Sequence, residues 1–125
     1  MDAIPDPVRR FLLTSIPSVP HLETLMLLWR EPERAFKADD IASRLYVSAS
    51  VAAALADDLS HAELLAVEED GASYRARQHP VELRELLDQV DRTYARQVKA
   101  VSQLLHSNLN RKAHSFAEAF FWRKA

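Results

Sequence analysis

The chain has 125 residues, of which 48% are hydrophobic and 27% are charged, and its formal net charge is −2. This length suits one globular domain with a hydrophobic core; the lack of cysteine excludes disulfides and thiolate metal sites, and a single glycine argues against phosphate-binding loops. The acidic N-terminus has no apolar run of signal length and no window is apolar enough to span a membrane, so we predict a cytoplasmic protein without a membrane partner.

The charges are divided unevenly along the chain. Residues 1–91 carry 9 basic and 17 acidic side chains, whereas residues 92–125 carry 7 basic side chains and one acid, Glu118. This split indicates either an anionic partner for the C-terminal part or pairing of that part with the acidic body of the same or a neighbouring subunit. Two independently solvated faces would give the same counts and carry about half the weight.

The N-terminal part predicts two helices. Asp6-Pro7 is a helix start signal, and Val8, Phe11 and Leu12 follow at helical spacing. Pro17 and Pro20 separate this helix from the next one. The segment His21–Arg30 is apolar nearly all round, which predicts the buried central helix of the domain.

The middle of the chain predicts two more helices joined by a tight turn. Phe36–Leu45 is expected to be helical, and Ser48 is a good N-cap for a second helix that ends at about His61. In this second helix Val51, Leu55 and Leu59 repeat at i+4 and are expected to face the core. The remaining positions are expected to face outward: Ala49, Ser50, Ala52, Ala53, Ala56, Asp57 and Ser60.

A β-hairpin follows the second helix of this pair. Leu64–Val67 and Ser73–Arg77 read as strands, and the Asp70-Gly71 pair between them is a strong turn signal. Between Arg44 and Arg75 the chain has no lysine or arginine. It has six acids there: Asp57, Asp58, Glu63, Glu68, Glu69 and Asp70.

The C-terminal part predicts one long helix and one short one. The long helix would run from His79-Pro80 to about His106, spanning roughly 39 Å at a rise of 1.5 Å per residue, which is longer than a small domain covers. We therefore expect its apolar stripe to pack on a second copy of the chain. The short helix, Arg111–Trp122, concentrates aromatic residues that are expected to dock on the domain or on a partner subunit. The dimerisation candidates are Leu87, Val90, Tyr94, Val98, Val101, Leu105, Phe116, Phe120, Phe121 and Trp122.

The stretch Ala38–Val51, continued by Leu59–Leu65 and the hairpin, resembles the winged helix-turn-helix of bacterial transcriptional regulators of the MarR and PadR kind over about residues 20–78. The resemblance implies a cytoplasmic homodimer in which the helix from Ala49 to about His61 enters the DNA major groove and the hairpin forms the wing. Tyr46 and Glu63 depart from the pattern, because such proteins commonly have glycine there. The recognition helix is also non-basic.

The predicted fold class is mainly α with a small β-hairpin. A winged helix-turn-helix with an N-terminal helix would occupy residues 1–78. A helical dimerisation segment, residues 79–125, would pack on it within a single domain.

Two functional hypotheses remain open. The first is a non-enzymatic, homodimeric transcriptional regulator that binds double-stranded DNA weakly or atypically, with phosphate contacts from the wing arginines and from the basic residues Arg92, Arg96, Lys99, Arg111, Lys112, Arg123 and Lys124. Its DNA-binding candidates are Lys37, Arg44, Ser48, Ser50, Ser60, Arg75 and Arg77. The alternative is a winged helix that has lost base readout and serves as a protein–protein interaction or dimerisation module, because the helix has none of the Arg, Asn or Gln residues that lead base recognition.

An enzyme is the third class considered. The five histidines are scattered, and no pair stands at i, i+4 with a carboxylate between them, as a helical zinc site would require. His61 near Glu63 and Asp57 is the nearest metal candidate, and a solvated helix end explains it better. We predict no cofactor, no metal and no catalytic residue.

Overall fold

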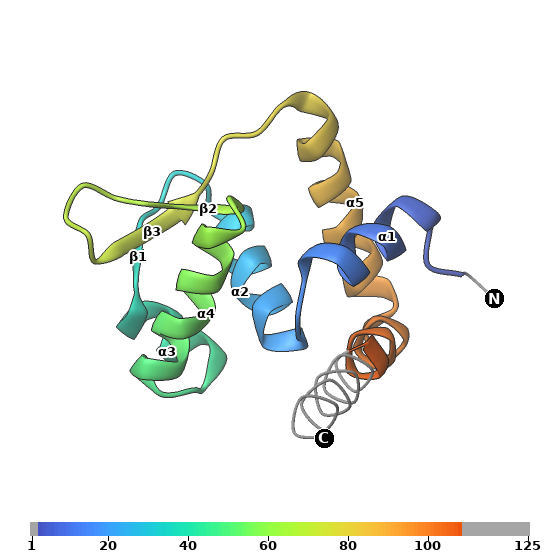
Figure 1. The fold of residues 1–125 in the computed structure, drawn as a ribbon, viewed down its shortest axis with the longest axis horizontal. Coiled ribbons are helices and arrows are strands. Elements are labelled where there is room, and N and C mark those ends of the chain that lie inside the picture. The colour runs from blue at the N-terminus through green and yellow to red at the C-terminus, as the bar shows by residue number, and fades with distance from the viewer. Residues whose placement is uncertain (1–2, 109–125) are drawn as a thin grey trace, which may run out of the picture.

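The computed structural model describes residues 3–108 (Figure 1). Within these residues it contains five helices and three strands, followed by a helical segment at residues 98–108. The elements are α1 (Asp6–Ser15), α2 (Val19–Arg30), β1 (Phe36–Lys37), α3 (Ala38–Leu45), α4 (Ala49–His61), β2 (Leu65–Val67), β3 (Ser73–Ala76) and α5 (Val81–Arg96). The predicted class, mainly α with a small β-hairpin in a winged helix-turn-helix, is confirmed.

The sheet has one strand more than the sequence predicted. Its three antiparallel strands follow the order β1-β3-β2, so that β3 lies in the centre. Phe36, which was predicted to open a helix, instead pairs with Tyr74 as part of β1 and is fully buried. A two-residue strand is too short to give an alternating pattern, which is why the sequence shows no sign of it.

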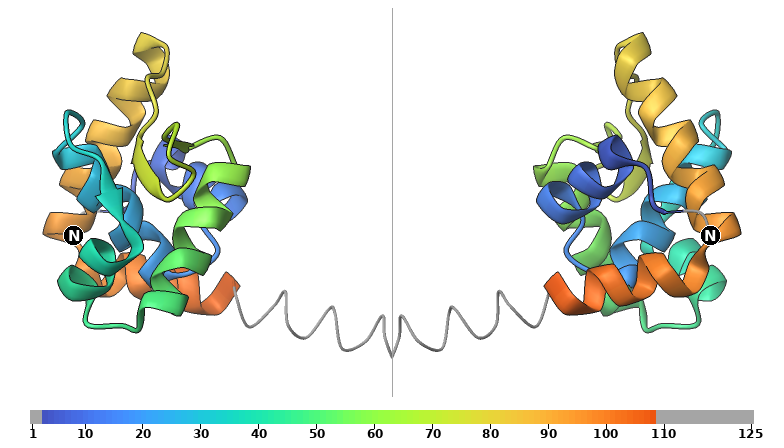
Figure 2. Two further views of the ribbon diagram at one scale, coloured as in Figure 1. Left: turned by 90° about the vertical axis from the view of Figure 1, so that its left-hand side faces the viewer. Right: turned by 90° about the vertical axis from the view of Figure 1, so that its right-hand side faces the viewer.

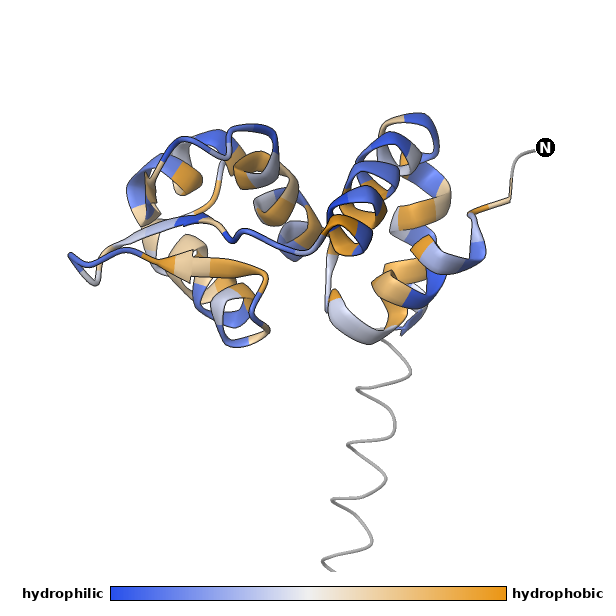
Figure 3. Ribbon diagram, turned by 90° about the horizontal axis from the view of Figure 1, so that it is seen from above, coloured by the Kyte–Doolittle hydropathy of each residue, from blue (hydrophilic) through white to orange (hydrophobic). Residues whose placement is uncertain are grey.

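One apolar core joins the winged helix to the other helices. Seen from above, the sheet with α3 and α4 lies at one end and α1 with α5 at the other (Figure 3). Helix α2 lies between them in Figure 1, and its side chains Leu22, Leu25, Met26 and Leu28 are buried. The sequence prediction of a buried central helix is therefore confirmed.

The prediction of one continuous helix from His79-Pro80 to about His106 is wrong. Helix α5 ends at Arg96, because the backbone of Gln97 leaves helical geometry (φ −131°, ψ 49°), and residues 98–108 form a second helical segment in a different direction (Figure 1). Asn108 donates a hydrogen bond to the Leu13 carbonyl of α1 at 3.2 Å. The apolar stripe is thus covered by the same chain, and its length no longer demands a second copy.

The predicted core face of α4 is shifted. Leu55 and Leu59 are buried as predicted, but Val51 is exposed while Ala52 and Ala56 are fully buried. A helix packed closely on α2 and α3 brings backbones together, and alanine fits such a contact better than valine does. Ala52 and Ala56 therefore face the core and Val51 faces solvent.

The two turns around α4 use left-handed backbone geometry without glycine. Tyr46 closes α3 at φ 58° and Glu63 follows α4 at φ 64°. In each case an L-residue adopts a conformation that costs roughly 1 kcal/mol or more relative to glycine. The helix-turn-helix geometry is therefore retained although both glycines are absent.

Candidate binding surface on the helix-turn-helix

The first half of α4 presents a small, uncharged outer surface. Ser48 caps the helix by accepting a hydrogen bond from the Val51 amide at 3.2 Å, as predicted. Ala49, Ser50, Val51 and Ala54 are exposed along this half. Tyr46, in the turn before it, is 94% exposed, and Val51 is 46% exposed. We call Tyr46, Ser50, Val51 and Ala54 the front face.

The second half of α4 carries carboxylates that are bonded to the body of the protein. The Tyr74 hydroxyl of β3 donates a hydrogen bond to Asp57. His21 Nε2 of α2 lies 2.7 Å from Asp58 Oδ2. These contacts fasten α4 to the sheet and to α2, so both acids have structural roles that the sequence did not reveal.

His21 also links Asp58 to the cap of α2. The Ser18 hydroxyl lies 2.6 Å from His21 Nδ1 and accepts the His21 amide at 3.4 Å. The order serine, histidine, aspartate is that of a nucleophilic triad. Because Ser18 serves as the helix cap and His21 joins that cap to Asp58 of α4, we interpret the chain of hydrogen bonds as structural.

The wing uses two of its acids internally. Glu68 pairs with Arg75 across the hairpin. Asp70 accepts the Ala72 and Ser73 amides at 2.9 Å each and the Ser73 hydroxyl at 2.7 Å. These hydrogen bonds, led by the one from Ala72, lower the pKa of Asp70. Gly71 completes the turn at φ +70°, where an L-residue would be strained.

Most cations of the winged helix are held by carboxylates. Arg30 bonds to Asp91 of α5, and Arg34 and Arg44 both lie 3.7 Å from Glu31. Arg75, besides its pair with Glu68, donates to the Glu33 carbonyl at 2.6 Å. Within residues 3–108, Lys37 and Arg77 are the DNA-binding candidates with charged side chains and no ion pair. Residues 19–78 hold six basic and eleven acidic side chains in all.

The serine candidates are largely committed to local hydrogen bonds. Ser48 is the α4 cap, and its hydroxyl lies 3.2 Å from that of Ser50. Ser60 donates to the Asp57 carbonyl at 2.9 Å, one turn back along α4. Ser50 therefore remains the serine that faces outward from the front face.

The dimerisation candidates lie mostly inside the chain. Leu87, Val90, Val101 and Leu105 are buried in the common core. The Tyr94 hydroxyl donates a hydrogen bond to Glu23 of α2 at 3.0 Å, and burial together with this contact raises the pKa of Tyr94 to about 12. Val98 is half exposed. Phe116, Phe120, Phe121 and Trp122 lie outside the described residues, as do Arg111, Lys112, Arg123 and Lys124.

The remaining basic candidates lie on α5 and on the helical segment that follows it. Arg92, Arg96 and Lys99 are all exposed. Arg92 and Arg96 border a shallow pocket of about 490 Å³ together with Ala3 and Pro5. Their side chains belong to the helical part of the molecule rather than to the winged helix.

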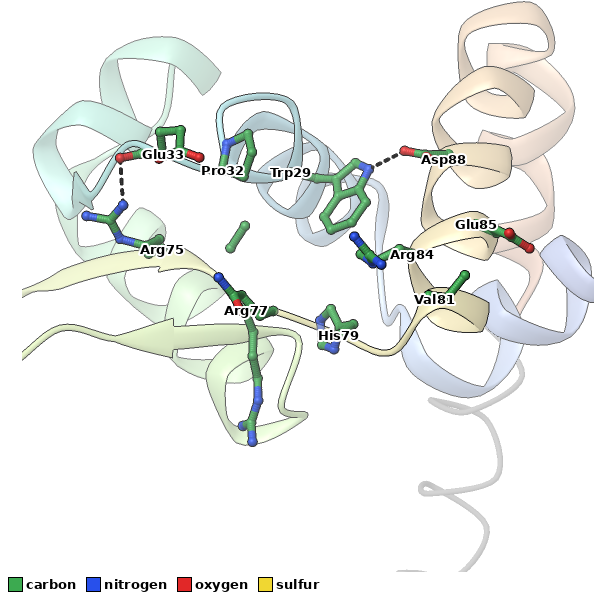
Figure 4. A pocket seen from close by; sticks show the side chains of 12 residues that line it. Trp29, Pro32, Glu33, Arg75, Arg77, His79, Val81, Arg84, Glu85 and Asp88 are labelled. Atoms are coloured by element: carbon green, nitrogen blue, oxygen red, sulfur yellow. Dashed lines mark hydrogen bonds between the residues drawn. The ribbon is translucent and has the colours of Figure 1, made fainter.

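A cleft of about 880 Å³ separates the end of β3 from α5 (Figure 4). Trp29 lies in it and donates its indole N–H to Asp88 at 2.9 Å. Arg84 points toward Trp29, whereas the Arg77 side chain turns away from the cleft (Figure 4). Burial lowers the pKa of His79, at the floor of the same cleft. The lining mixes cations with Glu33, Glu85 and Asp88 and therefore selects no class of ligand.

The described residues contain neither a cluster of metal-ligating side chains nor a helix that could cross a membrane by itself. Among residues 3–108, no group of three or more histidine, aspartate or glutamate side chains is arranged to hold a metal ion. In the same range no single helix is long and apolar enough to cross a membrane. Helices α1 and α2 meet the length and apolarity required only when they are counted as one segment, and a bend of 111° separates them.

Comparisons with known proteins give one structural match. No family model matches the sequence, and no curated protein matches it. Among solved structures, the chain is similar to "The structure of a MarR family protein from Bacillus stearothermophilus", with 16% sequence identity and a TM-score of 0.48 over 91% of this chain and 82% of that chain. The winged-helix fold follows from the element order β1, α3, α4, β2, β3 and from the antiparallel sheet order β1-β3-β2.

Proposed function

We propose that this protein is a non-enzymatic winged-helix regulator whose front face binds a polypeptide instead of the DNA major groove. The observation that carries the proposal is the character of the front face: Tyr46 and Val51 are exposed there, and cations are absent from it. A DNA-reading helix needs the opposite composition, with basic and amide side chains directed outward.

Tyr46 is the expected centre of the contact. Tyrosine is enriched at the energetic centres of protein interfaces, and burying a side chain of the size of valine or larger contributes about 1.5–3 kcal/mol. Tyr46 also holds a left-handed backbone at almost full exposure. Such strain at an exposed residue is typical of functional positions.

The electrostatics support the same proposal. A protein that neutralises several phosphates needs several free cations, yet four of the six cations of the winged helix are bonded to carboxylates. The excess of acids over bases in residues 19–78 would repel a polyanion. A polypeptide with apolar and basic side chains would be attracted instead.

Photo-crosslinking in cells tests this proposal. A benzophenone side chain replaces Tyr46 in one variant and Val81, a half-exposed residue at the start of α5, in the control variant. The expected product at position 46 is an adduct that protease degrades and nuclease does not. Nuclease-sensitive adducts at position 46, or adducts at both positions alike, would contradict the proposal.

DNA binding is the second candidate function, and one observation favours it. The first half of α4 has no charged side chain, and Asp57 and Asp58 of its second half are bonded to Tyr74 and His21. Ser50 and Ala54 are small enough for base edges and thymine methyl groups. Phosphate contacts would then come from Lys37 and Arg77 in each subunit of a homodimer, so that removing both side chains would abolish binding.

A further inference from the structure

The charges of the winged helix and of the last residues of the chain are complementary. Residues 19–78 hold eleven acids against six bases. Residues 109–125 hold Arg111, Lys112, Arg123 and Lys124 against Glu118 alone. Opposite charges of this size attract at the range of a few ångströms to about 10 Å that physiological salt allows.

The apolar residues of the two regions are complementary as well. Residues 109–125 include Phe116, Phe120, Phe121 and Trp122. Five large apolar side chains are exposed within residues 3–108, and two of them, Tyr46 and Val51, belong to one stretch of six residues that runs from the turn after α3 into the first turn of α4. The other three, Val67, Val81 and Val98, lie on separate elements. Among these, the front face is therefore the place where several aromatic side chains can be covered together.

The chain is long enough to reach the front face. Residues 98–108 and the turn between α3 and α4 both lie at the lower edge of the molecule in Figure 2, and Figure 1 shows the turn toward the left and residues 98–108 toward the right of that edge. Asn108 is held beside α1 by its bond to Leu13. An extended chain gains about 3.3–3.6 Å per residue, so that residues 109–125 can span more than 50 Å, well over the radius of gyration of about 13 Å expected for a domain of this size.

We propose that residues 109–125 are the polypeptide that occupies the front face, with their aromatic side chains on Tyr46, Val51 and Ala54 and their basic side chains toward the carboxylates of α4 and the wing. This inference rests on the proposed function, because it names the partner of the same surface. The segment binds the front face of its own chain, and binding to a second copy is an alternative outcome of the test below. Any other polypeptide has to displace it.

Trp122 supplies a spectroscopic reporter for this contact in the full-length protein. The chain has two tryptophans, so Trp29→Phe leaves Trp122 as the only one. We expect Trp122 to be protected from acrylamide quenching. Adding Tyr46→Ala and Val51→Ala should raise its quenching constant on the order of twofold, because the indole loses an apolar contact. The matched control, Val67→Ala with Val81→Ala, removes equally exposed valines elsewhere and should leave the constant unchanged.

Salt and sample concentration sharpen the readout. High salt should weaken the protection, since part of the attraction is between exposed charges. Protection that persists on dilution indicates closure within one chain, and protection that disappears indicates closure by a second copy; both support the contact. If Trp122 is already fully quenched while Tyr46 and Val51 are intact, the proposal is overturned. Equal effects of the two double variants on the quenching constant would overturn it as well.

A second measurement covers the case in which Trp29→Phe fails to fold, since Trp29 bonds to Asp88. In the unsubstituted chain labelled with 5-fluorotryptophan, the Trp122 resonance should shift on Tyr46→Ala while the Trp29 resonance stays in place. An unmoved Trp122 resonance would overturn the inference. If the Trp122 resonance does not move and the crosslinker at position 46 captures a different protein, this inference fails and the proposed function stands. If the crosslinker captures nucleic acid, both the inference and the proposed function fail.

Discussion

The two halves of α4 behave as different surfaces of one helix. The second half carries Asp57 and Asp58, and both carboxylates are bonded to residues of other elements, Tyr74 and His21. The first half carries no charge, and within the described residues its exposed side chains make no side-chain hydrogen bond to another element; Ser50 bonds locally to Ser48. The acidic half holds the helix in place, and the neutral half is left available for binding.

This difference changes how acidic residues on a helix-turn-helix are interpreted. Counted along the sequence, six acids between Arg44 and Arg75 suggest a surface that repels DNA everywhere. Counted in space, four of them are bonded within the protein: Asp57, Asp58, Glu68 and Asp70. Charge on such a helix therefore has to be assigned to internal contacts before it is used as an argument about ligands.

The largest expected effect comes from the buried face of α4. Leu59→Ala should lower the free energy of unfolding by about 2–5 kcal/mol, because the side chain is 1% exposed and leaves a cavity. Val51→Ala, on the front face of the same helix, should change it by less than about 0.5 kcal/mol. Urea denaturation of both variants measures the contrast. Similar losses for the two would mean that the front face is part of the core.

Removing the hydroxyl that fastens the second half of α4 should have a smaller effect. Tyr74→Phe deletes the hydrogen bond to Asp57, which is worth about 1–2 kcal/mol for a charged acceptor that water still reaches. Denaturation at neutral pH tests this value. A variant as stable as the natural chain would show that Asp57 does not fasten α4.

The same hydroxyl predicts a dependence on alkaline pH. The Asp57 contact raises the pKa of Tyr74 from 10.0 to about 12, so the protonated hydroxyl stabilises the folded state. That contribution is complete below pH 10 and is lost as the pH rises from 10 to about 12. The natural chain should lose more stability over this interval than Tyr74→Phe does. Tyr94, whose pKa is raised in the same way, contributes equally to both proteins.

The smallest effects concern the left-handed turns. Tyr46→Gly should leave stability unchanged or raise it by up to about 1 kcal/mol, since glycine relieves the backbone strain. Gly71→Ala in the wing should lower it by about 1 kcal/mol, because its φ of +70° disfavours an L-residue although no atom lies within 4 Å of an added Cβ. Thermal unfolding of both variants gives the signs. A clear loss of stability in Tyr46→Gly would mean that the tyrosine side chain makes a contact within the folded chain that outweighs the relieved strain.

The sequence predicted those parts of the fold that depend on local signals. The cap at Ser48, the bounds of α4 and the Asp70-Gly71 turn follow from residues close to one another, and the structure confirms them. On α4 the prediction is right for Leu55 and Leu59 and wrong for Val51, because Val51 outranks Ala52 in hydropathy while close helix packing prefers the smaller side chain.

Other features could not be read from the sequence. The contact of Asp57 with Tyr74 spans 17 positions and that of His21 with Asp58 spans 37, so neither leaves a local pattern. The break at Gln97 has no proline or glycine to announce it, and the apolar spacing continues through it. The exposure of the Tyr46 side chain could not be predicted from the sequence either, since a tyrosine in a turn more often packs its ring against a neighbouring element.

The central claim is that the front face of α4 does not read DNA, and a salt titration tests it most directly. The natural chain and a Lys37→Ala/Arg77→Ala variant are titrated into a labelled random duplex of about 30 base pairs, at low and at physiological salt, with fluorescence anisotropy as the readout. Our account predicts no saturable binding up to about 100 μM protein, where even non-specific DNA-binding proteins are normally bound, and no difference between the two proteins. Saturable binding at low salt that falls steeply as salt rises, and that the double substitution abolishes, would contradict it.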